Sequence, residues 1–487
     1  MSGRQFTRRD FLKAATLTAA GTVLAACGPA PTAEVVEVEV EKVITQEVQT
    51  EVEVEVEKVV TATPGAAPES ATIRFLEMGG RWQSWVEQLA LPTFYDEYPW
   101  ITVEYEPIDW STFPDKQLTQ MAAGTAPEIM HGWSEVFQKW VSKGQLLDLG
   151  PLVEADFPEE DKADQIPFQW DTLVFPFTGE RYAIPGYVDM GLLYYNKDAY
   201  DAKGLSYPDE TWTYDDYAET CAALNVYEGG RQTVWGGWYW YGSWTFMSYR
   251  INAFGGKVRD DETWMTCLLS EPEAKEAIEW IRARIWDDSS WLNSTQMAAV
   301  GVSGDSAELF ATEVFSMMEA DIEFWPSMAK NVRLNWDIMH VPIGPAGRFN
   351  LGDNDAWCMY KGAAERGTEI ASWKFMRFLN SPFFQRLMVY QDGVVPARWS
   401  INKEWPGILR QQWPELEPVT LEVVTDAFEM GYLTPSEQFR YQADAQPIVQ
   451  AALERIWQVG DAGVEILDEV CAEVNRAQQD ALAKEDL

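Results

Sequence analysis

Tryptophans and acidic residues recur in this sequence where predicted β-strands end. The densest stretch, from Trp235 to Trp244, holds four tryptophans and two tyrosines. Indole rings offer flat apolar faces, and carboxylates accept strong hydrogen bonds from hydroxyl groups. A pyranose ring needs both kinds of partner, because its C–H faces are apolar and its rim is hydroxylated. These residue types therefore indicate a site for a polyhydroxylated ligand.

The candidate contacts share a position, since ligands of open α/β sheets collect where loops leave the carboxyl ends of strands. Each candidate can instead be a packing residue or a solvated loop end, and a single tryptophan packs more often than it binds. Glycines interrupt the run from Trp235 to Trp244, which has neither a helix nor a strand period, so we expect part of it to face ligand. The predicted ligand-binding residues are Glu77, Arg81, Trp82, Trp133, Glu135, Tyr187, Asp189, Trp238, Trp240, Trp244, Glu319, Asp321, Trp325, Asp355 and Trp357.

Composition excludes several other kinds of site. The net charge is −40 and no cluster of Lys and Arg appears, which argues against a nucleic-acid partner. His131 and His340 are the two histidines, so we expect no metal and no cofactor. His131 reads as a satisfied histidine at a strand end rather than a ligand group. Asp353-Asn354-Asp355 lacks the full calcium-loop pattern, so a turn is expected there rather than a Ca²⁺ site.

The elements that must position these residues alternate between strands and helices. Residues 72–77, 101–105 and 128–133 read as strands, and helices are predicted over 82–98 and 113–123, the second ending at Gly124. This βαβαβ order predicts an α/β fold with a parallel sheet and helices on both faces. Further strands are predicted at 192–196, 314–319 and 336–341, and helices at 213–225, 272–287, 364–380 and 444–457.

Several local motifs, in this order and spacing, resemble one large family. The chain resembles the extracytoplasmic solute-binding proteins of ABC importers, family 1, the maltose-binding-protein-like carbohydrate type. The resemblance covers nearly all of residues 71–487. The motifs are Tyr182–Tyr187, Asp189–Lys197, Thr211–Tyr217 with Thr213 as helix N-cap, Ala253–Gly256, Phe315–Glu319, and the stretch 352–399 with Trp373, Phe375 and Phe378 as helix packing.

The resemblance implies an α/β, two-lobe periplasmic-binding-protein fold with hinge crossovers. Each lobe would be a mostly parallel sheet flanked by helices, with the N-terminal lobe at 71–185 and 352–399 and the C-terminal lobe at 186–351 and 400–487. It implies a monomer that binds a carbohydrate in the interlobe cleft and delivers it to an ABC-transporter membrane permease. By the same resemblance, Asp189 falls where several members place an acidic sugar contact.

Residues 1–27 read as an export signal. Arg8 and Arg9 sit in a stretch that resembles the twin-arginine export motif, and Leu24–Cys27 resembles a lipobox. The apolar part between them is too short to span a bilayer. We therefore expect export, lipidation at Cys27, and a protein that is extracytoplasmic and lipid-anchored to the cell membrane. The alternative is an ordinary secretory signal with an incidental cysteine.

Residues 28–70 read as a tether, because they carry ten Glu, two Lys and no Asp or Arg. Like charges favour an extended chain, so a spacer between membrane and body is expected, with a self-pairing β ribbon as the alternative. Beyond Cys27, the cysteines are Cys221, Cys267, Cys358 and Cys471. They allow three pairings, among which sequence does not choose, and four free thiols are an equal alternative.

Two rival functions remain open at this stage. An exported glycosidase would need two carboxylates at a defined separation, which sequence does not show, and no HExxH, GxSxG, P-loop or GxGxxG motif appears. We therefore expect no enzyme activity. The same fold could also bind a non-sugar solute such as a peptide, a polyamine or a phosphodiester. A phosphodiester would call for basic residues at the strand ends, where Arg81 is the one good candidate.

Overall fold

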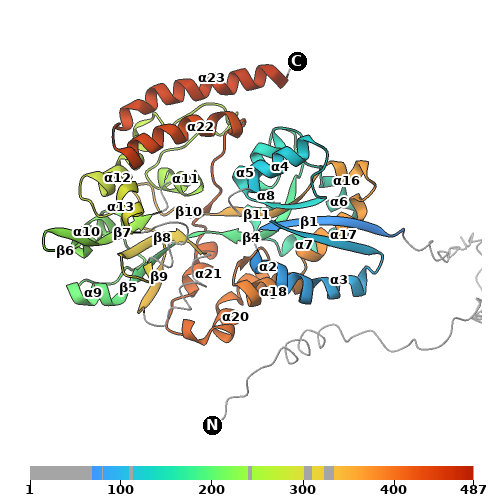
Figure 1. The fold of residues 1–487 in the computed structure, drawn as a ribbon, viewed down its shortest axis with the longest axis horizontal. Coiled ribbons are helices and arrows are strands. Elements are labelled where there is room, and N and C mark those ends of the chain that lie inside the picture. The colour runs from blue at the N-terminus through green and yellow to red at the C-terminus, as the bar shows by residue number, and fades with distance from the viewer. Residues whose placement is uncertain are drawn as a thin grey trace, which may run out of the picture. The chain divides into compact units, whose positions relative to one another are not determined.

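The structure of the protein is a computed structural model (Figure 1). Its first strand, β1, covers Ala71–Met78. The structure describes residues 69–485, except for residue 79 and the segments 109–112, 240–243, 301–309 and 323–333. The predicted export signal and nearly all of the predicted tether lie outside the described residues. Ser70–Leu487 forms one compact unit. None of the helices in the described ranges is long and apolar enough to cross a membrane.

Six strands form the first sheet, in the order β12-β4-β11-β3-β1-β2. Strands β2 (Ile101–Ile108) and β3 (Ile129–Gly132) run parallel to β1 on either side of it, as the βαβαβ pattern predicts. Strand β11 (Asp353–Met359) is antiparallel to both β3 and β4 (Ala183–Asp189), and the short β12 (Val395–Pro396) is antiparallel to β4. The α/β class is confirmed, and the returning strands make the sheet mixed.

The predicted helix over 82–98 is divided in the structure. It consists of α2 (Gly80–Trp85), a π-helical turn at Val86–Ala90 and α3 (Leu91–Glu97). Leu91 begins the last segment and Pro92 is its second residue, near the helix start where proline is tolerated. Helix α4 (Phe113–Ala122) is followed by Gly124 at φ 72°, the left-handed conformation expected of a residue just past a helix end.

Five strands form the second sheet, in the order β6-β7-β8-β5-β9. Strands β7 (Arg231–Tyr239) and β8 (Phe315–Asp321) are parallel, whereas β5 (Gly191–Asn196) is antiparallel to both β8 and β9 (Trp336–Met339). Strand β6 (Val226–Glu228) forms a hairpin with β7. The three strands predicted for this part of the chain are therefore present.

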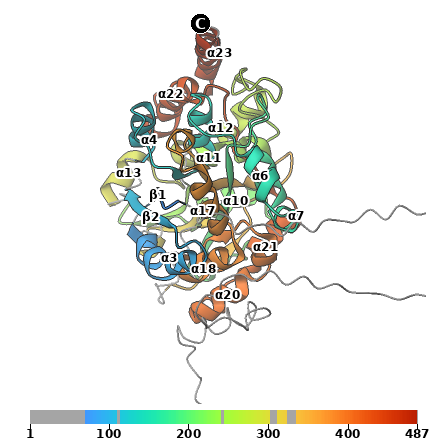
Figure 2. The ribbon, with the colours of Figure 1, turned by 90° about the vertical axis from the view of Figure 1, so that its right-hand side faces the viewer.

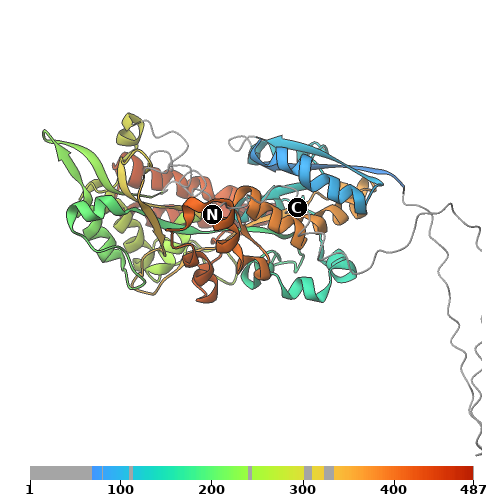
Figure 3. The same ribbon diagram turned by 90° about the horizontal axis from the view of Figure 1, so that it is seen from below.

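Two short crossings lead out of the first sheet, one to the second sheet and one to the two-stranded sheet that contains β10. Figures 1 and 3 show the two larger sheets on either side of them. Met190 is the one residue between β4 and β5, and Gly352 is the one residue between β10 (Asn350–Leu351) and β11. At the crossing Asp353 pairs with Asp189. Strand β10 also pairs with β13 (Leu433–Thr434), a second link to the C-terminal part of the chain. We call these two crossings the hinge.

The Asp353-Asn354-Asp355 run belongs to this hinge, because it begins β11. The expectation of a turn at these residues was therefore wrong. Three consecutive polar side chains obscured the strand, since a β pattern is normally recognised from its apolar residues.

Local capping signals account for several helix boundaries. Helix α10 (Tyr214–Leu224) begins at Thr213, whose side chain and that of Asp216 form a reciprocal capping box, as the predicted N-cap requires. Helix α12 (Pro272–Trp286) matches its prediction. The predicted helix 364–380 is instead α16 (Gly362–Glu365) and α17 (Glu369–Leu379), because Gly367 between them has φ 69°. The prediction at 444–457 corresponds to α22 (Gln442–Leu453), extended by a π-helical turn at Glu454–Val459.

The remaining helices cover the sheets and fill the C-terminal part. Figure 2 shows α23 (Leu467–Glu485) running beside α22, with which it packs. The others are α5 (Ser134–Val141), α6 (Gly150–Asp156), α7 (Glu159–Ala163), α8 (Pro167–Thr172), α9 (Lys197–Lys203), α11 (Trp244–Ala253), α13 (Ser294–Val300), α18 (Pro382–Asp392), α19 (Trp399–Asn402), α20 (Trp405–Gln412) and α21 (Glu422–Glu429).

Helix α17 packs through its aromatic face, since Trp373, Phe375 and Phe378 are buried as predicted. Among the cysteines, Cys267 and Cys471 form a disulfide whose Cα atoms are 5.1 Å apart. Cys221 and Cys358 are buried free thiols, and burial raises the pKa of both. Their thiols are therefore held protonated and unreactive.

Candidate functional site

Three buried ionisable side chains meet where β1, β3 and β11 lie side by side. His131 is fully buried, with its Nδ1 3.2 Å from Glu77 Oε1 and its Nε2 3.0 Å from Asp355 Oδ1. Strand pairing causes this, because parallel β1 and β3 align Glu77 with His131, and β11 adds Asp355 from the hinge. The structure confirms His131 as a satisfied strand-end histidine. We call these residues the Glu77–His131–Asp355 cluster.

Aromatic rings enclose this cluster. Tyr187 stacks on the His131 ring with centroids 5.5 Å apart, and Trp357 Nε1 donates to Glu77 Oε2 at 3.3 Å. Trp82 packs 5.5 Å from Tyr187 and donates its indole N–H to Asp392, at the end of α18. Five of the sequence-predicted residues are therefore brought together, and all five are buried: Glu77, Trp82, Tyr187, Asp355 and Trp357.

Four predicted residues are half-buried: Trp133, Glu135, Asp189 and Asp321. Trp133 stacks on Phe113 with centroids 5.7 Å apart, just before α5, and Glu135 in the first turn of that helix pairs with Lys139 at 2.8 Å. Asp189 ends β4 at the hinge, and Asp321 ends β8. Strand pairing sets Asp321 opposite Gly191, two residues beyond Asp189. The hinge thus brings strand ends of both sheets together.

Glu319 has a structural setting within the second sheet. It is fully buried and forms an ion pair with the fully buried Arg250, while Tyr249 donates its hydroxyl hydrogen to the same carboxylate. Arg250 also lies over the ring of Tyr214 at 4.8 Å. This arrangement compensates two buried charges, which would otherwise be costly.

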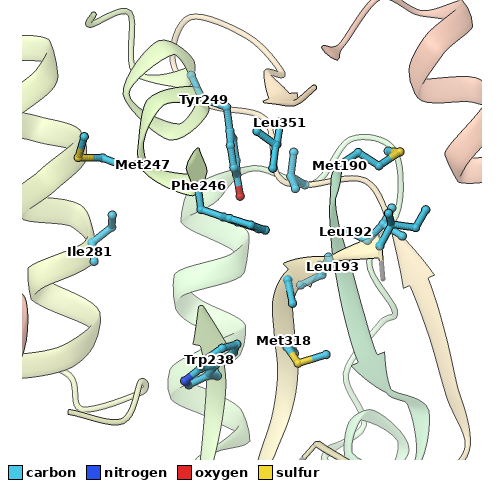
Figure 4. Close-up of a cluster of buried hydrophobic side chains, with 14 of the residues drawn as sticks. Met190, Leu192, Leu193, Trp238, Phe246, Met247, Tyr249, Ile281, Met318 and Leu351 are labelled. Atoms are coloured by element: carbon cyan, nitrogen blue, oxygen red, sulfur yellow. The ribbon is translucent and has the colours of Figure 1, made fainter. Parts of the chain in front are cut away.

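Trp238 and Trp244 are placed in the core of the second half of the body, and Figure 4 shows Trp238 among its apolar side chains. Trp238 is 3 % exposed and stacks on Phe315 with centroids 5.8 Å apart. Trp244 is 5 % exposed and donates its N–H to the carbonyl of Glu437 at 2.9 Å. Both indole rings are therefore packed against other residues of the protein in this structure.

The glycines in this run have a packing reason that sequence reasoning missed. Strand β7 continues through Gly236 and Gly237, and a Cβ on Gly236 would overlap the backbone carbonyl of Cys221 in α10. The glycines therefore allow α10 to pack closely on the strand. The expectation that part of the run faces ligand stays a prediction, because residues 240–243 lie outside the described residues.

Several predicted residues lie outside the described part of the chain. These are Trp240, Trp325, the predicted lipidation site Cys27 and the side chain of Arg81. The segments that follow β1, β2, β7 and β8 also fall partly outside it, at 79, 109–112, 240–243 and 323–333. The described site is therefore the part formed by strand ends and the hinge.

Burial dominates the electrostatics of the described hinge. It raises the pKa of Asp353, although hydrogen bonds from Ser134 and the Asn354 backbone oppose the shift. Outside the hinge, in β2, burial likewise raises the pKa of Tyr105, with the charge of Glu77 adding to it. Within the described residues, no group of three His, Cys, Asp or Glu side chains could hold a metal ion. Sequence reasoning missed Phe113 and Asp392, which carry no local signal and join the site only through packing.

The chain matches a family model of bacterial extracellular solute-binding proteins over residues 79–383. Among curated proteins, a binding protein of Brucella abortus strain 2308 is 23 % identical over 327 residues, covering 64 % of this chain and 71 % of that protein.

Solved structures show the same fold. An ABC substrate-binding protein from Listeria monocytogenes in complex with cycloalternan superposes with a TM-score of 0.70 at 18 % identity, covering 85 % of this chain and 100 % of that one. The protein UgpB from Mycobacterium tuberculosis in complex with glycerophosphocholine gives 0.69 at 20 % identity, covering 86 % and 100 %. These neighbours have the two-lobe periplasmic-binding-protein fold that the sequence predicts.

Proposed function

The chain belongs to the family of bacterial extracellular solute-binding proteins, and we propose that it captures a carbohydrate, an oligosaccharide by preference, between its two lobes. The proposed lobes are 71–185 with 352–399 and 186–351 with 400–487. One observation carries the proposal: the hinge brings the half-buried carboxylates of Asp189 and Asp321 to neighbouring strand ends of different sheets. A ligand bound there contacts both lobes and favours their closure.

The residue types at this edge suit a sugar. Asp189, Asp321 and Glu135 supply carboxylate acceptors for hydroxyl groups, and Trp133 supplies a half-exposed ring for a C–H face. The Glu77–His131–Asp355 cluster lies beneath, and its role in the proposal is to hold the ends of β1 and β3 rigid. Glu319, Trp238 and Trp244 are left out of the proposed contacts, because the structure buries them against other partners.

Structural neighbours support a carbohydrate without deciding which one. Their bound ligands include cycloalternan, maltotriose and mannobiose. The glycerophosphocholine complex of UgpB favours a second candidate, a phosphodiester. The described strand ends weigh against that candidate, because they present carboxylates, and an anionic ligand next to them would be repelled.

We further propose that the loaded protein docks on the membrane permease of an ABC importer, as a monomer held at the outer face of the membrane by lipid on Cys27. The lipobox-like Leu24–Cys27 and the acidic spacer before the body support anchoring. Incorporation of labelled fatty acid into the wild-type chain, but not into a Cys27→Ala variant, is the expected result. Equal labelling of both would contradict the anchor.

Thermal unfolding of Ser70–Leu487 against a ligand panel tests the proposed function. The panel holds maltose and mannose oligosaccharides, glycerophosphocholine, spermidine and short peptides. A ligand at 100 times its Kd should add about 2.7 kcal/mol to the free energy of unfolding. Shifts with sugars are expected. Shifts with the other compounds alone would contradict the carbohydrate, and chemical turnover of the sugar would contradict a binding protein.

A further inference from the structure

A cavity of about 600 Å³ lies between elements on the two sides of the hinge, and no sequence-predicted site residue lines it. Its walls include Ser134 and Gln138 of α5 and Thr172 of α8, which belong with the first sheet. Asn252 of α11 and Thr434 of β13 line it from the other side. The volume lies within the range of about 300–1,000 Å³ typical of small-molecule sites.

The cavity is separate from the Glu77–His131–Asp355 cluster. Asn354 lines the cavity, whereas its neighbour Asp355 bonds to His131. Successive side chains of a strand point to opposite faces. The hinge strand β11 therefore stands between the cluster and the cavity.

Two buried amide groups offer unused acceptors at this cavity. Asn354 is 2 % exposed and Gln438 is 4 % exposed. Their amide nitrogens donate to Thr172 Oγ1 at 2.6 Å and Ser436 Oγ at 2.8 Å, both of which are side chains of cavity-lining residues. Among the residues that the structure describes, the carbonyl oxygens Asn354 Oδ1 and Gln438 Oε1 have no hydrogen-bond partner. Buried acceptors without a partner are costly, so a ligand that donates hydrogen bonds would stabilise both.

Most of the charged groups of the cavity wall have partners within the protein. Lys257 and Arg259 both pair with Asp261, and Arg259 lies over the Trp264 ring at 4.1 Å. Glu437 accepts hydrogen bonds from Asn252 Nδ2 at 2.8 Å and from the backbone N–H of Val258 at 2.6 Å. With Asp171, the wall carries three acidic and two basic side chains. Within the described part of the chain, the buried acceptors of the wall without a partner are thus the two neutral amide oxygens of Asn354 and Gln438.

Aromatic side chains form the rest of the cavity wall. Phe175, Tyr182, Trp264 and Phe349 line the cavity. Trp264 packs edge to face on Phe177 at 5.3 Å, which joins the two sides of the hinge. Ring faces beside amide acceptors suit a ligand with both C–H surface and hydroxyl donors.

We propose that this cavity is a second ligand site, distinct from the strand-end site, for a small neutral polyhydroxylated molecule of mono- or disaccharide size. Its hydroxyl groups donate to Asn354 Oδ1 and Gln438 Oε1. Because both sides of the hinge line the cavity, an occupant stabilises the hinge arrangement of this structure and is thermodynamically coupled to a ligand of the strand-end site.

Calorimetric titration of Ser70–Leu487 carrying Asp189→Ala tests the cavity apart from the strand-end site. The probes are mannitol, glucose and trehalose, with glucose 6-phosphate and spermidine as charged comparisons. We expect at least one neutral probe to saturate the protein. Adding Gln438→Met, which removes the acceptor, should weaken that binding about tenfold, and Thr434→Trp, which fills the cavity, should abolish it.

Gln117→Met is the matched control, because Gln117 is equally buried but lies on α4, away from the cavity wall. It should leave the affinity for the neutral probe unchanged. No saturation by any neutral probe, saturation by the charged probes alone, or affinities that Gln438→Met and Thr434→Trp both leave intact would overturn the proposal. Failure of the strand-end site appears separately, as equal sugar affinity in the wild type and the Asp189→Ala variant.

Discussion

His131 shows how a residue near a binding site can be structural. Its ring links two buried carboxylates from different strands, so its loss would leave Glu77 and Asp355 facing each other without it. The sequence predicted a satisfied histidine, but its partners come from positions 54 and 224 residues away, and no local pattern carries that information.

His131→Asn should therefore destabilise the protein by about 1–3 kcal/mol, the usual cost of leaving buried polar groups without their hydrogen-bond partner. Urea unfolding of Ser70–Leu487 measures it. Glu135→Gln is a suitable control, since its pair with Lys139 is partly exposed and should contribute less than about 1 kcal/mol. A loss for His131→Asn no greater than that of the control would contradict the cluster's structural role.

His340 makes a different, pH-dependent contribution. Burial, assisted by the charge of Arg348, lowers the pKa of His340 to about 4, against about 6.5 in an unfolded chain. As pH falls, the unfolded chain takes up this proton first. The contribution of His340 to stability is therefore complete above about pH 6.5 and is lost between there and about pH 4.

The corresponding measurement compares the wild type with His340→Asn at pH 7 and pH 4. The advantage of the wild type in free energy of unfolding should shrink by roughly 3 kcal/mol over that interval, which is the pKa difference expressed as free energy. An advantage that stays constant with pH would show that His340 is not held neutral in the native state.

In the tryptophan-rich stretch from Trp235 to Trp244, residue types alone do not distinguish ligand-binding side chains from core side chains. Residue types and spacing predicted Trp238 and Trp244 as ligand contacts, yet each is at most 5 % exposed in the structure. Binding and packing both use flat apolar rings, so only the depth of a residue in the fold separates the two. Trp133 keeps a half-exposed ring because it lies between the end of β3 and the start of α5.

At the scale of elements, sequence periodicity and capping predicted most of the fold. The Thr213 cap, the βαβαβ order and the strands β5, β8 and β9 followed from local signals. The breaks inside 82–98 and 364–380 did not, because a helical apolar pattern continues across them. The polar start of β11 was missed for the opposite reason, since it is buried by hinge pairing and not by apolar side chains.

The disulfide is an element-scale feature that cysteine counting left open among its alternatives. It ties residue 267, in the segment that carries Trp264, to α23 across a sequence separation of 204 residues. Asn475 of α23 also accepts a hydrogen bond from the Cys267 N–H at 2.8 Å. The C-terminal helix is therefore fixed to the wall of the cavity.

Replacing both residues, Cys267→Ser with Cys471→Ser, should lower the free energy of unfolding by about 2–5 kcal/mol, because the unfolded chain loses its cross-link. Urea unfolding with and without reductant supplies the control. Reductant should lower the stability of the wild type by the same amount and leave the double variant unchanged. A wild type insensitive to reductant after full reduction of the bond would contradict the prediction.

For the whole molecule, the central feature is how briefly the chain passes out of the first sheet. One residue separates β4 from β5 of the second sheet, and one separates β11 from β10 of the small β10–β13 sheet. The short β4–β5 link places strand ends of the two larger sheets next to each other, which is why Asp189 and Asp321 lie at one edge. The family resemblance predicted this architecture from scattered motifs. The cavity behind β11 could not be predicted, because its wall comes from many distant segments.

The most direct test of the account is calorimetric titration of Ser70–Leu487 with the sugar that gives the largest thermal shift, in the wild type and in Asp189→Asn. We predict saturable binding in the wild type, recovery of the sugar chemically unchanged, and at least tenfold weaker affinity in Asp189→Asn, the loss expected when a charge-assisted hydrogen bond is removed. The control Asp215→Asn, on the exposed first turn of α10, should bind as the wild type does. No binding of any sugar to the wild type, or equal affinity in Asp189→Asn, would contradict a carbohydrate site at the hinge.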